Sequence, residues 1–218
     1  MIDIPSDLPA ELVPLSWLIG VWEGTGLVEY EIGDEVRRHE FGQRVSFSHD
    51  GLPFLNYSSF TWQFGDAVPS GSEGTPDALG GPEDTVATVP LVTENGYWRL
   101  SRPPTEADPG PGMLPGVGPR PFSTAASVET LRNASDGFDV EVSLVHPTGV
   151  TELYLGRVKG PRIDLATDAV MRTESAKEYS AATRIYGLVE GDLLWAWDIA
   201  ALGQELRTHA SGRLHRRD

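Results

Sequence analysis

Hydrophobic and polar residues alternate along much of the chain, which is the pattern of half-buried β-strands. In the clearest stretch, residues 137–146, one side is apolar and the other polar; the apolar positions are Phe138, Val140, Val142 and Leu144. Residues 44–49, 162–165 and 192–199 alternate in the same way. We therefore expect short strands with one face toward a core.

Turn signals separate these runs. They are Asp50-Gly51, Asn95-Gly96, Asp136-Gly137, Lys159-Gly160-Pro161 and Glu190-Gly191-Asp192. About ten strands can be counted by this pattern. No helix of crossover length lies between them, which argues against a parallel sheet. The sequence predicts an all-β, antiparallel fold, either a sandwich or a closed barrel.

Three segments depart from the alternation. Residues 7–19 place Leu8, Leu12, Leu15 and Ile19 at helical spacing, and Pro14 limits the helix, so we expect a short helix that plugs one end of the core. Residues 65–85 and 102–121 are rich in Gly and Pro and poor in apolar residues, which predicts surface loops. We interpret residues 1–218 as one domain with two loop insertions.

Composition narrows the chemistry. The chain has no cysteine, which excludes disulfides and thiolate-bound metals. Its net charge of -15 makes nucleic acid and anionic membrane surfaces poor partners. The N-terminus lacks the basic and apolar regions of a secretory signal, and no apolar run is long enough to span a membrane, so we expect a cytoplasmic protein.

The motif Gly20-x-Trp22-x-Gly24-x-Gly26 follows the opening helix. Alternate glycines clear one face of a strand, so that the backbone can bend or a ligand or lid can approach closely. Trp22 supplies a large apolar group near the barrel end.

Five histidines are the candidate metal ligands. None pairs with another at metal-site spacing. His39 and His215 lie in charged runs, where we expect solvated side chains. His49 and His146 fall on the apolar side of their strands near strand ends, and we expect hydrogen-bonded core or rim histidines there. Read without any family comparison, His209 is an unremarkable residue near a C-terminal strand.

Several segments together resemble the nitrobindin family of haem-binding β-barrels. The glycine motif is similar to that family's N-terminal signature, and residues 202–216, with Gly203-Gln204-x-Leu206-x-x-His209, are similar to its C-terminal pattern. Further matches occur in order at residues 47–54, 94–99, 146–152 and 176–178. The resemblance covers nearly the whole chain apart from the two Gly/Pro-rich loops.

The resemblance implies a roughly ten-stranded barrel, similar to fatty-acid-binding proteins, with haem b at one end. By motif position His209 would be the proximal iron ligand, and Lys177 would pair with a haem propionate. It also implies binding of nitric oxide and isomerisation of peroxynitrite to nitrate at ferric haem, so that the partners would be small diatomic or anionic nitrogen species. A Lewis-acidic iron needs no acid–base pair for that reaction.

Parity raises a difficulty for this assignment. In a regular strand over residues 206–216, His209 would share the outward face with Arg207, Ser211 and Arg213. An inward His209 would require the last strand to begin after it, with residues 204–208 forming a turn; the polar residues just before it permit this.

Two other hypotheses remain open at this point. The same barrel could carry a fatty acid or another apolar molecule, with Trp22, Trp62, Trp195 and Trp197 around its cavity. It could instead be an interaction module that acts through its long loops. The oligomeric state is also open, with a homodimer among the options.

Overall fold

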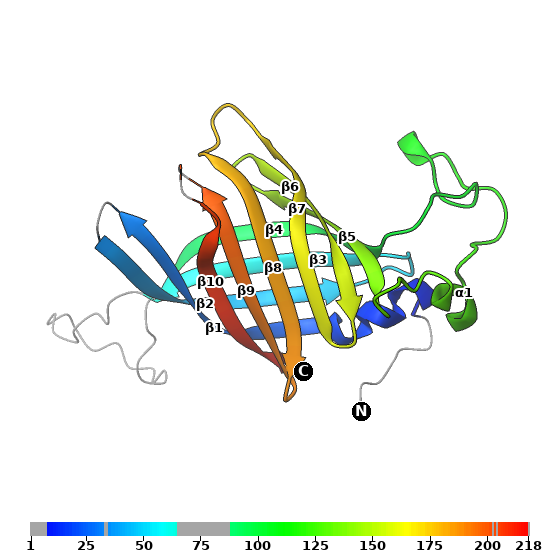
Figure 1. The fold of residues 1–218 in the computed structure, drawn as a ribbon, viewed down its shortest axis with the longest axis horizontal. Helices are drawn as coiled ribbons and strands as arrows, with labels where there is room; N and C mark the ends of the chain where they lie inside the picture. The colour runs from blue at the N-terminus through cyan, green and yellow to red at the C-terminus, as the bar shows by residue number, and fades with distance from the viewer. Residues whose placement is uncertain (1–7, 33–34, 65–87, 202, 204, 218) are drawn as a thin grey trace, which may run out of the picture.

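The computed structural model describes residues 8–32, 35–64, 88–201, 203 and 205–217. Its ten antiparallel strands form a closed barrel in which each strand pairs with its sequence neighbours and the last pairs with the first (Figure 1). The strands are β1 (Gly20–Ile32), β2 (Glu35–Ser48), β3 (Leu55–Phe64), β4 (Thr88–Leu100), β5 (Phe138–His146), β6 (Val150–Lys159), β7 (Arg162–Arg172), β8 (Tyr179–Val189), β9 (Asp192–Ala201) and β10 (Arg207–Arg217). The predicted all-β barrel is confirmed.

Alternation identified the core correctly. Side chains at the predicted apolar positions of β5 are buried, as are Val45 and Phe47 of β2 and Ile163 and Leu165 of β7. One predicted turn is wrong, because Asn95 and Gly96 lie inside β4. A Cβ atom on Gly96 would lie 2.0 Å from the Ser143 carbonyl oxygen. Gly96 therefore serves close strand packing and not chain reversal.

Helical segments close one end of the barrel (Figure 1). Residues Ala10–Leu18 form a 3-10 helix, η1, with Pro14 inside it, and its Leu12 and Leu15 are fully buried in the barrel core. The predicted plug is confirmed, although it is a 3-10 helix. The short helix α1 (Ala125–Glu129) lies at the same end and buries Val128. We call this end the closed end.

The glycine motif runs from the closed end along β1. Trp22 is buried in the core, and its indole Nε1 donates to the Leu18 carbonyl oxygen at 2.7 Å. A Cβ atom on Gly24 would lie 2.2 Å from the Arg213 carbonyl oxygen of β10, and one on Gly26 would lie 2.3 Å from the Phe41 ring. The predicted close approach to the glycines is thus confirmed, but the groups that approach are the β10 backbone and the Phe41 ring, not a ligand or lid. The motif serves the closure of the barrel by β10.

The opposite end, where β1 ends and β10 begins, is the mouth of the barrel. Among the described strands, four ladders show a register shift, and all four shifts lie near the mouth. The extra residues are Leu91 in β4, Asp168 in β7, Ser180 in β8 and His209 in β10. β7 pairs with β8 only over Arg162–Ala166, so these strands separate toward the mouth. Bulges and this separation shape an irregular rim.

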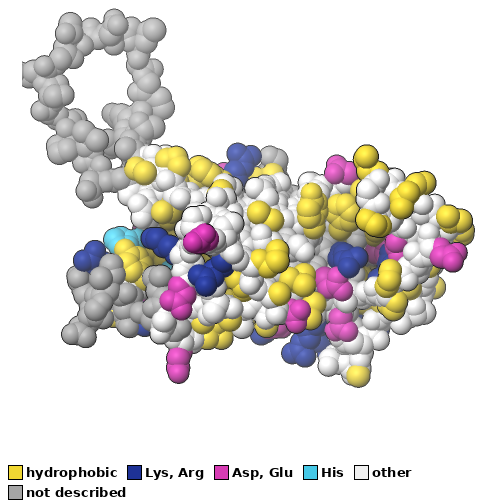
Figure 2. Space-filling model, turned by 90° about the horizontal axis from the view of Figure 1, so that it is seen from above, with side chains coloured by type: hydrophobic (Ala, Val, Ile, Leu, Met, Phe, Trp, Pro, Cys, Tyr) yellow, Lys and Arg dark blue, Asp and Glu magenta, His cyan; other side chains and the backbone are white. Residues whose placement is uncertain are grey.

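The predicted loop 65–85 lies outside the described residues. Residues 102–121 run over the surface as predicted, with a short 3-10 turn, η2 (Pro111–Met113). Their first residue is fixed, because Arg102 pairs with Glu11 of η1 and, at 2.7 Å, with Asp108. On the face in Figure 2, apolar side chains are interspersed with charged ones. No helix in the described part of the chain has the length and apolar character to cross a membrane.

Candidate functional site at the barrel mouth

Two connected cavities occupy the mouth and the barrel interior below it. The inner cavity, of about 120 Å³, is lined by Gln43, Glu94, Arg184, Trp195 and other inward side chains. The outer pocket, of about 660 Å³, opens at the rim beside Lys177, Tyr179 and Val150. Four residues line both: Val92, His146, Trp197 and His209. The outer pocket has the size of a cofactor site.

His209 reaches this junction because it is the extra residue of a β-bulge. Thr208 pairs with Asp198, and Ala210 pairs with Trp197, so His209 has no partner of its own in the ladder. The bulge lets His209 and Ala210 both line the inner cavity. The strand begins at Arg207, so an inward His209 does not require the later start that regular alternation would have demanded. The predicted inward imidazole is correct, and the bulge supplies it.

The environment of His209 suits a neutral metal-ligating imidazole. Burial lowers its pKa, Arg207 adds to the effect, and a hydrogen bond to the backbone of Glu29 partly offsets it. The ring also meets Trp197 edge to face, with centroids 5.5 Å apart. His209 is thus oriented from two sides.

Lys177 lies in the loop between β7 and β8 and lines the same outer pocket as His209. Its backbone oxygen accepts a hydrogen bond from Arg172 at 3.0 Å, which anchors the loop. Among the described residues, no acidic side chain pairs with its ammonium group. The structure therefore brings together the two cofactor-binding residues that the resemblance implied.

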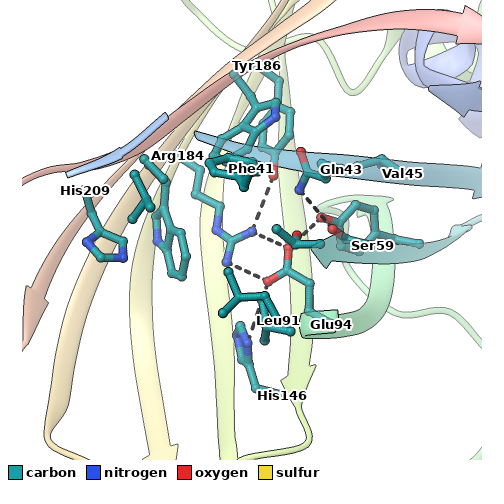
Figure 3. A pocket seen from close by; sticks show the side chains of 17 residues that line it. Phe41, Gln43, Val45, Ser59, Leu91, Glu94, His146, Arg184, Tyr186 and His209 are labelled. Atoms are coloured by element: carbon teal, nitrogen blue, oxygen red, sulfur yellow. Dashed lines mark hydrogen bonds and ion pairs between the residues drawn. The ribbon is translucent and has the colours of Figure 1, made fainter. Parts of the chain in front are cut away.

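A charged cluster fills the barrel below the outer pocket. Arg184 of β8 is only 3% exposed, and its guanidinium donates to both carboxylate oxygens of Glu94, at 2.8 and 2.9 Å (Figure 3). It also donates to the Tyr154 hydroxyl at 3.0 Å and lies over the Trp197 ring, 4.4 Å from the centroid. Such buried charge is tolerated only when it is paired and hydrogen-bonded.

Glu152 of β6 is the second acid of this cluster and is fully buried. Its carboxylate accepts hydrogen bonds from Tyr154 at 2.6 Å and from Tyr179, and His146 Nε2 lies 2.7 Å from its other oxygen. Arg184 is also in reach, at 3.4 Å. His146 is thus the hydrogen-bonded rim histidine that parity predicted.

Both carboxylates stay ionised despite their burial. Burial alone would raise the pKa of Glu94, but Arg184, with help from His146 and Tyr57, lowers it to about 2. Burial opposes ionisation of Glu152 as well, and hydrogen bonds from His146 and the tyrosines, together with Arg184, lower its pKa. The interior therefore holds two anionic groups around one guanidinium.

Sequence analysis missed this cluster. Glu94, Glu152 and Arg184 each occupy the core-facing parity of a strand, beside Trp98, Tyr154 and Tyr186. Charged residues at apolar parity were the available signal, since a buried charge needs a partner on another strand. The other histidines lie elsewhere: His39 stacks on Tyr30, His49 accepts from the Gly51 amide, and His215 pairs with Asp192.

The interior does not suit an apolar carrier. Its inner cavity of about 120 Å³ is smaller than the roughly 300 Å³ at which small-molecule sites begin. The guanidinium of Arg184, which faces this interior, is already neutralised by Glu94. Trp195 and Trp197 line this cavity, but Trp22 packs in the core and Trp62 packs against Phe60 and Gly42. The site that remains is the outer pocket.

The outer pocket also limits the kind of metal site. In the described part of the chain, no three His, Cys, Asp or Glu side chains gather to hold a metal ion. His146, the other histidine of this pocket, is hydrogen-bonded to Glu152, so His209 is left as the candidate protein ligand. One histidine beside the pocket fits a metal whose other ligands come from a macrocycle, as in haem. Lys177 at the rim fits the carboxylates such a group carries.

Comparison with known proteins agrees with this geometry. The family model of the THAP4-like, heme-binding beta-barrel domain matches residues 11–216. A protein named peroxynitrite isomerase from Clavibacter michiganensis subsp. michiganensis is 68% identical over 214 residues, which cover 98% of each chain. Proteins of the same name from Leifsonia xyli subsp. xyli and Paenarthrobacter aurescens are 65% and 50% identical, each with 98% of its length covered.

A solved structure has the same architecture. The crystal structure of Rv2717c from M. tuberculosis superposes with a TM-score of 0.60 and 28% sequence identity, covering 99% of this chain and 100% of that one. The relatives thus extend over both the closed end and the mouth.

Proposed function

We propose that this chain, which belongs to the family of THAP4-like, haem-binding β-barrel domains, binds haem b in its outer pocket and isomerises peroxynitrite to nitrate. Family membership confirms the resemblance seen in the glycine motif and the C-terminal segment. The observation that carries the proposal is the bulged His209, whose oriented imidazole lines the pocket.

In this proposal His209 would hold the haem iron. Its lowered pKa keeps the imidazole neutral at neutral pH, which is the form that binds iron. Its edge-to-face contact with Trp197 would help to hold the ring in place. Bound ferric haem would supply Lewis-acidic iron for the chemistry of peroxynitrite and nitric oxide.

Lys177 would hold a haem propionate at the rim. An exposed ammonium is a modest contributor to affinity, so its main effect is on the orientation of the cofactor.

The charged cluster would keep the anionic substrate and product at the mouth. Glu94 and Glu152 together outweigh the single charge of Arg184 in the barrel interior, and every hydrogen-bonding oxygen of Glu152 is occupied. An anion that entered the inner cavity would meet unfavourable charge in a medium of low dielectric constant. Nitrate therefore leaves by the route through which peroxynitrite entered.

The proposal is tested by adding haem to the purified protein. We expect a Soret band that shifts with nitric oxide, and faster peroxynitrite decay with nitrate as the product. His209→Ala should lose the band and the acceleration. His215→Ala is the matched control, because His215 is exposed at the closed end and pairs only with surface groups.

Two results would overturn the proposal. One is a His209→Ala protein that keeps the wild-type Soret band, which would reject the ligand. The other is a haem-loaded protein that leaves peroxynitrite decay unchanged, which would reject the reaction while leaving haem binding intact.

A further inference from the structure

We propose that Tyr179 is a modification site of the haem-loaded protein: peroxynitrite nitrates its ring beside the hydroxyl, and Glu152 accepts the phenolic proton. This inference rests on the proposed function, because it requires peroxynitrite to be drawn to the outer pocket. It adds a second, self-modifying reaction to isomerisation at the same site.

Tyr179 is the tyrosine of the outer pocket. It opens β8 and lines the pocket with Lys177 and His209, just before the bulge at Ser180. Its ring centroid lies 6.4 Å from that of Trp197, whose ring is 5.5 Å from His209. Three aromatic rings thus form a contiguous path from the candidate axial ligand to Tyr179. An oxidising species formed at the pocket meets this phenol next to it.

A proton acceptor is already in place. The Tyr179 hydroxyl donates to the Glu152 carboxylate, which is ionised because His146, Arg184 and the tyrosines lower its pKa. When an electron leaves a phenol, the phenolic proton becomes strongly acidic and must go to a base. Here it can move along an existing hydrogen bond without any rearrangement.

The inference has two requirements, a hydrogen bond to the Glu152 carboxylate and access from the outer pocket, and two other tyrosines allow them to be tested separately. Tyr154 donates to the same carboxylate at 2.6 Å but is 0% exposed and lines neither cavity of the mouth. Tyr97 is 57% exposed on the outer face of β4, where its ring packs against Phe54. Tyr154 therefore has the proton acceptor but is not accessible from the pocket. Tyr97 is accessible to solvent but does not lie in the pocket.

The chemistry balances without an outside reductant. In the haem-loaded protein, peroxynitrous acid is drawn to the outer pocket, where its O–O bond breaks to give nitrogen dioxide and hydroxyl radicals. Hydroxyl takes one electron from Tyr179 and becomes hydroxide, while the phenolic proton moves to Glu152. Nitrogen dioxide joins the ring carbon beside the hydroxyl by a new C–N bond, and the hydrogen on that carbon moves to the phenolic oxygen. Glu152 returns its proton to hydroxide as water, so phenol and peroxynitrous acid yield nitrophenol and water.

The experiment treats apo and haem-loaded protein with the same amount of peroxynitrite and maps nitrotyrosine by peptide mass spectrometry. We expect Tyr179 to carry more nitro group than Tyr97 in the loaded protein, and Tyr97 to carry more in the apo protein. Tyr154→Phe should leave nitration of Tyr179 in place, since the acceptor Glu152 remains. Tyr179→Phe should remove the mouth-specific product.

The outcomes separate this inference from the proposed function. A protein that binds haem and forms nitrate but leaves Tyr179 unmodified overturns the modification site alone. Equal nitration of Tyr179 in apo and loaded protein also overturns it, because the haem-loaded pocket would then play no part. A protein without a Soret band or accelerated decay fails as a haem-dependent isomerase, and both proposals fall.

Discussion

The closed end and the mouth are built from the same ten strands but obey different rules. At the closed end the ladders are regular, and glycines with positive φ, such as Gly160 and Gly191, make short turns. The apolar side chains of η1 fill the space inside. At the mouth four bulges break the ladders, and ionised side chains occupy the interior. Regular alternation makes a filled core, and departures from it make the site.

The two regions also differ in how they are stabilised. The closed end depends on apolar burial, which tolerates small changes of shape at modest cost. The cluster of Arg184, Glu94 and Glu152 depends on complete pairing, since a lone buried charge is strongly unfavourable. We therefore expect that removing one charged partner from the mouth cluster lowers the free energy of unfolding more than a small change of an apolar side chain at the closed end.

Arg184→Met should have the largest effect. It leaves Glu94 and Glu152 buried without their cation, and breaking such a pair costs about 3–5 kcal/mol. Urea titration should show that loss in the free energy of unfolding at pH 7. Arg162→Met is the control, because Arg162 pairs with Asp164 on the surface of β7 and its loss should leave the midpoint unchanged. Similar midpoints for both variants would mean that the buried cluster stabilises the fold no more than a surface ion pair does.

Gly24→Ala tests the closure of the barrel and should come next. The new methyl group would meet the Arg213 backbone at 2.2 Å, and overpacking of this kind costs about 1–3 kcal/mol. Gly187→Ala in β8 is the matched control, because the nearest atom to its Cβ would be at 3.8 Å. Thermal unfolding compares the two variants, and an equal Tm would show that β1 and β10 can separate freely at this point.

Trp197→Leu should loosen the site without unfolding the barrel. It removes the ring that contacts His209 and Arg184, and losses of supporting contacts around a metal ligand reduce affinity about 10-fold or more. Haem transfer to an acceptor protein measures the dissociation rate. Trp62→Leu alters an indole on the outer face and should leave that rate as it is. Equal rates in the two variants would remove Trp197 from the site.

Acidification should have the mildest effect. The folded pKa of His209 lies below the ordinary value of 6.5 because of burial, so protons compete with the metal only at lower pH. Haem retention should stay constant as pH falls to 6.5 and decline below it, since protonated imidazole cannot ligate. Absorption at the Soret band follows this. A loss that begins above pH 6.5 would contradict the lowered pKa.

The closed end could be predicted from the sequence, and the mouth only in part. Phe138 to Leu144 alternate without interruption, and the structure buries all four apolar positions. The plug was predicted because Leu12 and Leu15 share a helical face, although the spacing did not distinguish a 3-10 helix. Asn95-Gly96 was wrongly predicted as a turn, because in the sequence a glycine needed for close strand packing looks the same as a glycine in a turn.

At the mouth, bulges make the alternation of hydrophobic and polar residues an unreliable guide to which side chains point inward. One extra residue shifts every later side chain to the other face, and neither Ser180 nor His209 carries a sequence mark of its position in a bulge. The resemblance placed His209 and Lys177 together, which periodicity could not do. Arg184, Glu94 and Glu152 meet from three strands, and only the closed barrel brings such distant residues into contact.

The most direct test of His209 as the ligand is the absorption spectrum of His209→Gly with haem, measured with and without added imidazole. A glycine leaves a space that free imidazole can fill beside Trp197. We predict a weak, displaced Soret band that imidazole restores to the wild-type position. A wild-type band in His209→Gly without imidazole would contradict the assignment and leave the bulge as a feature of the fold alone.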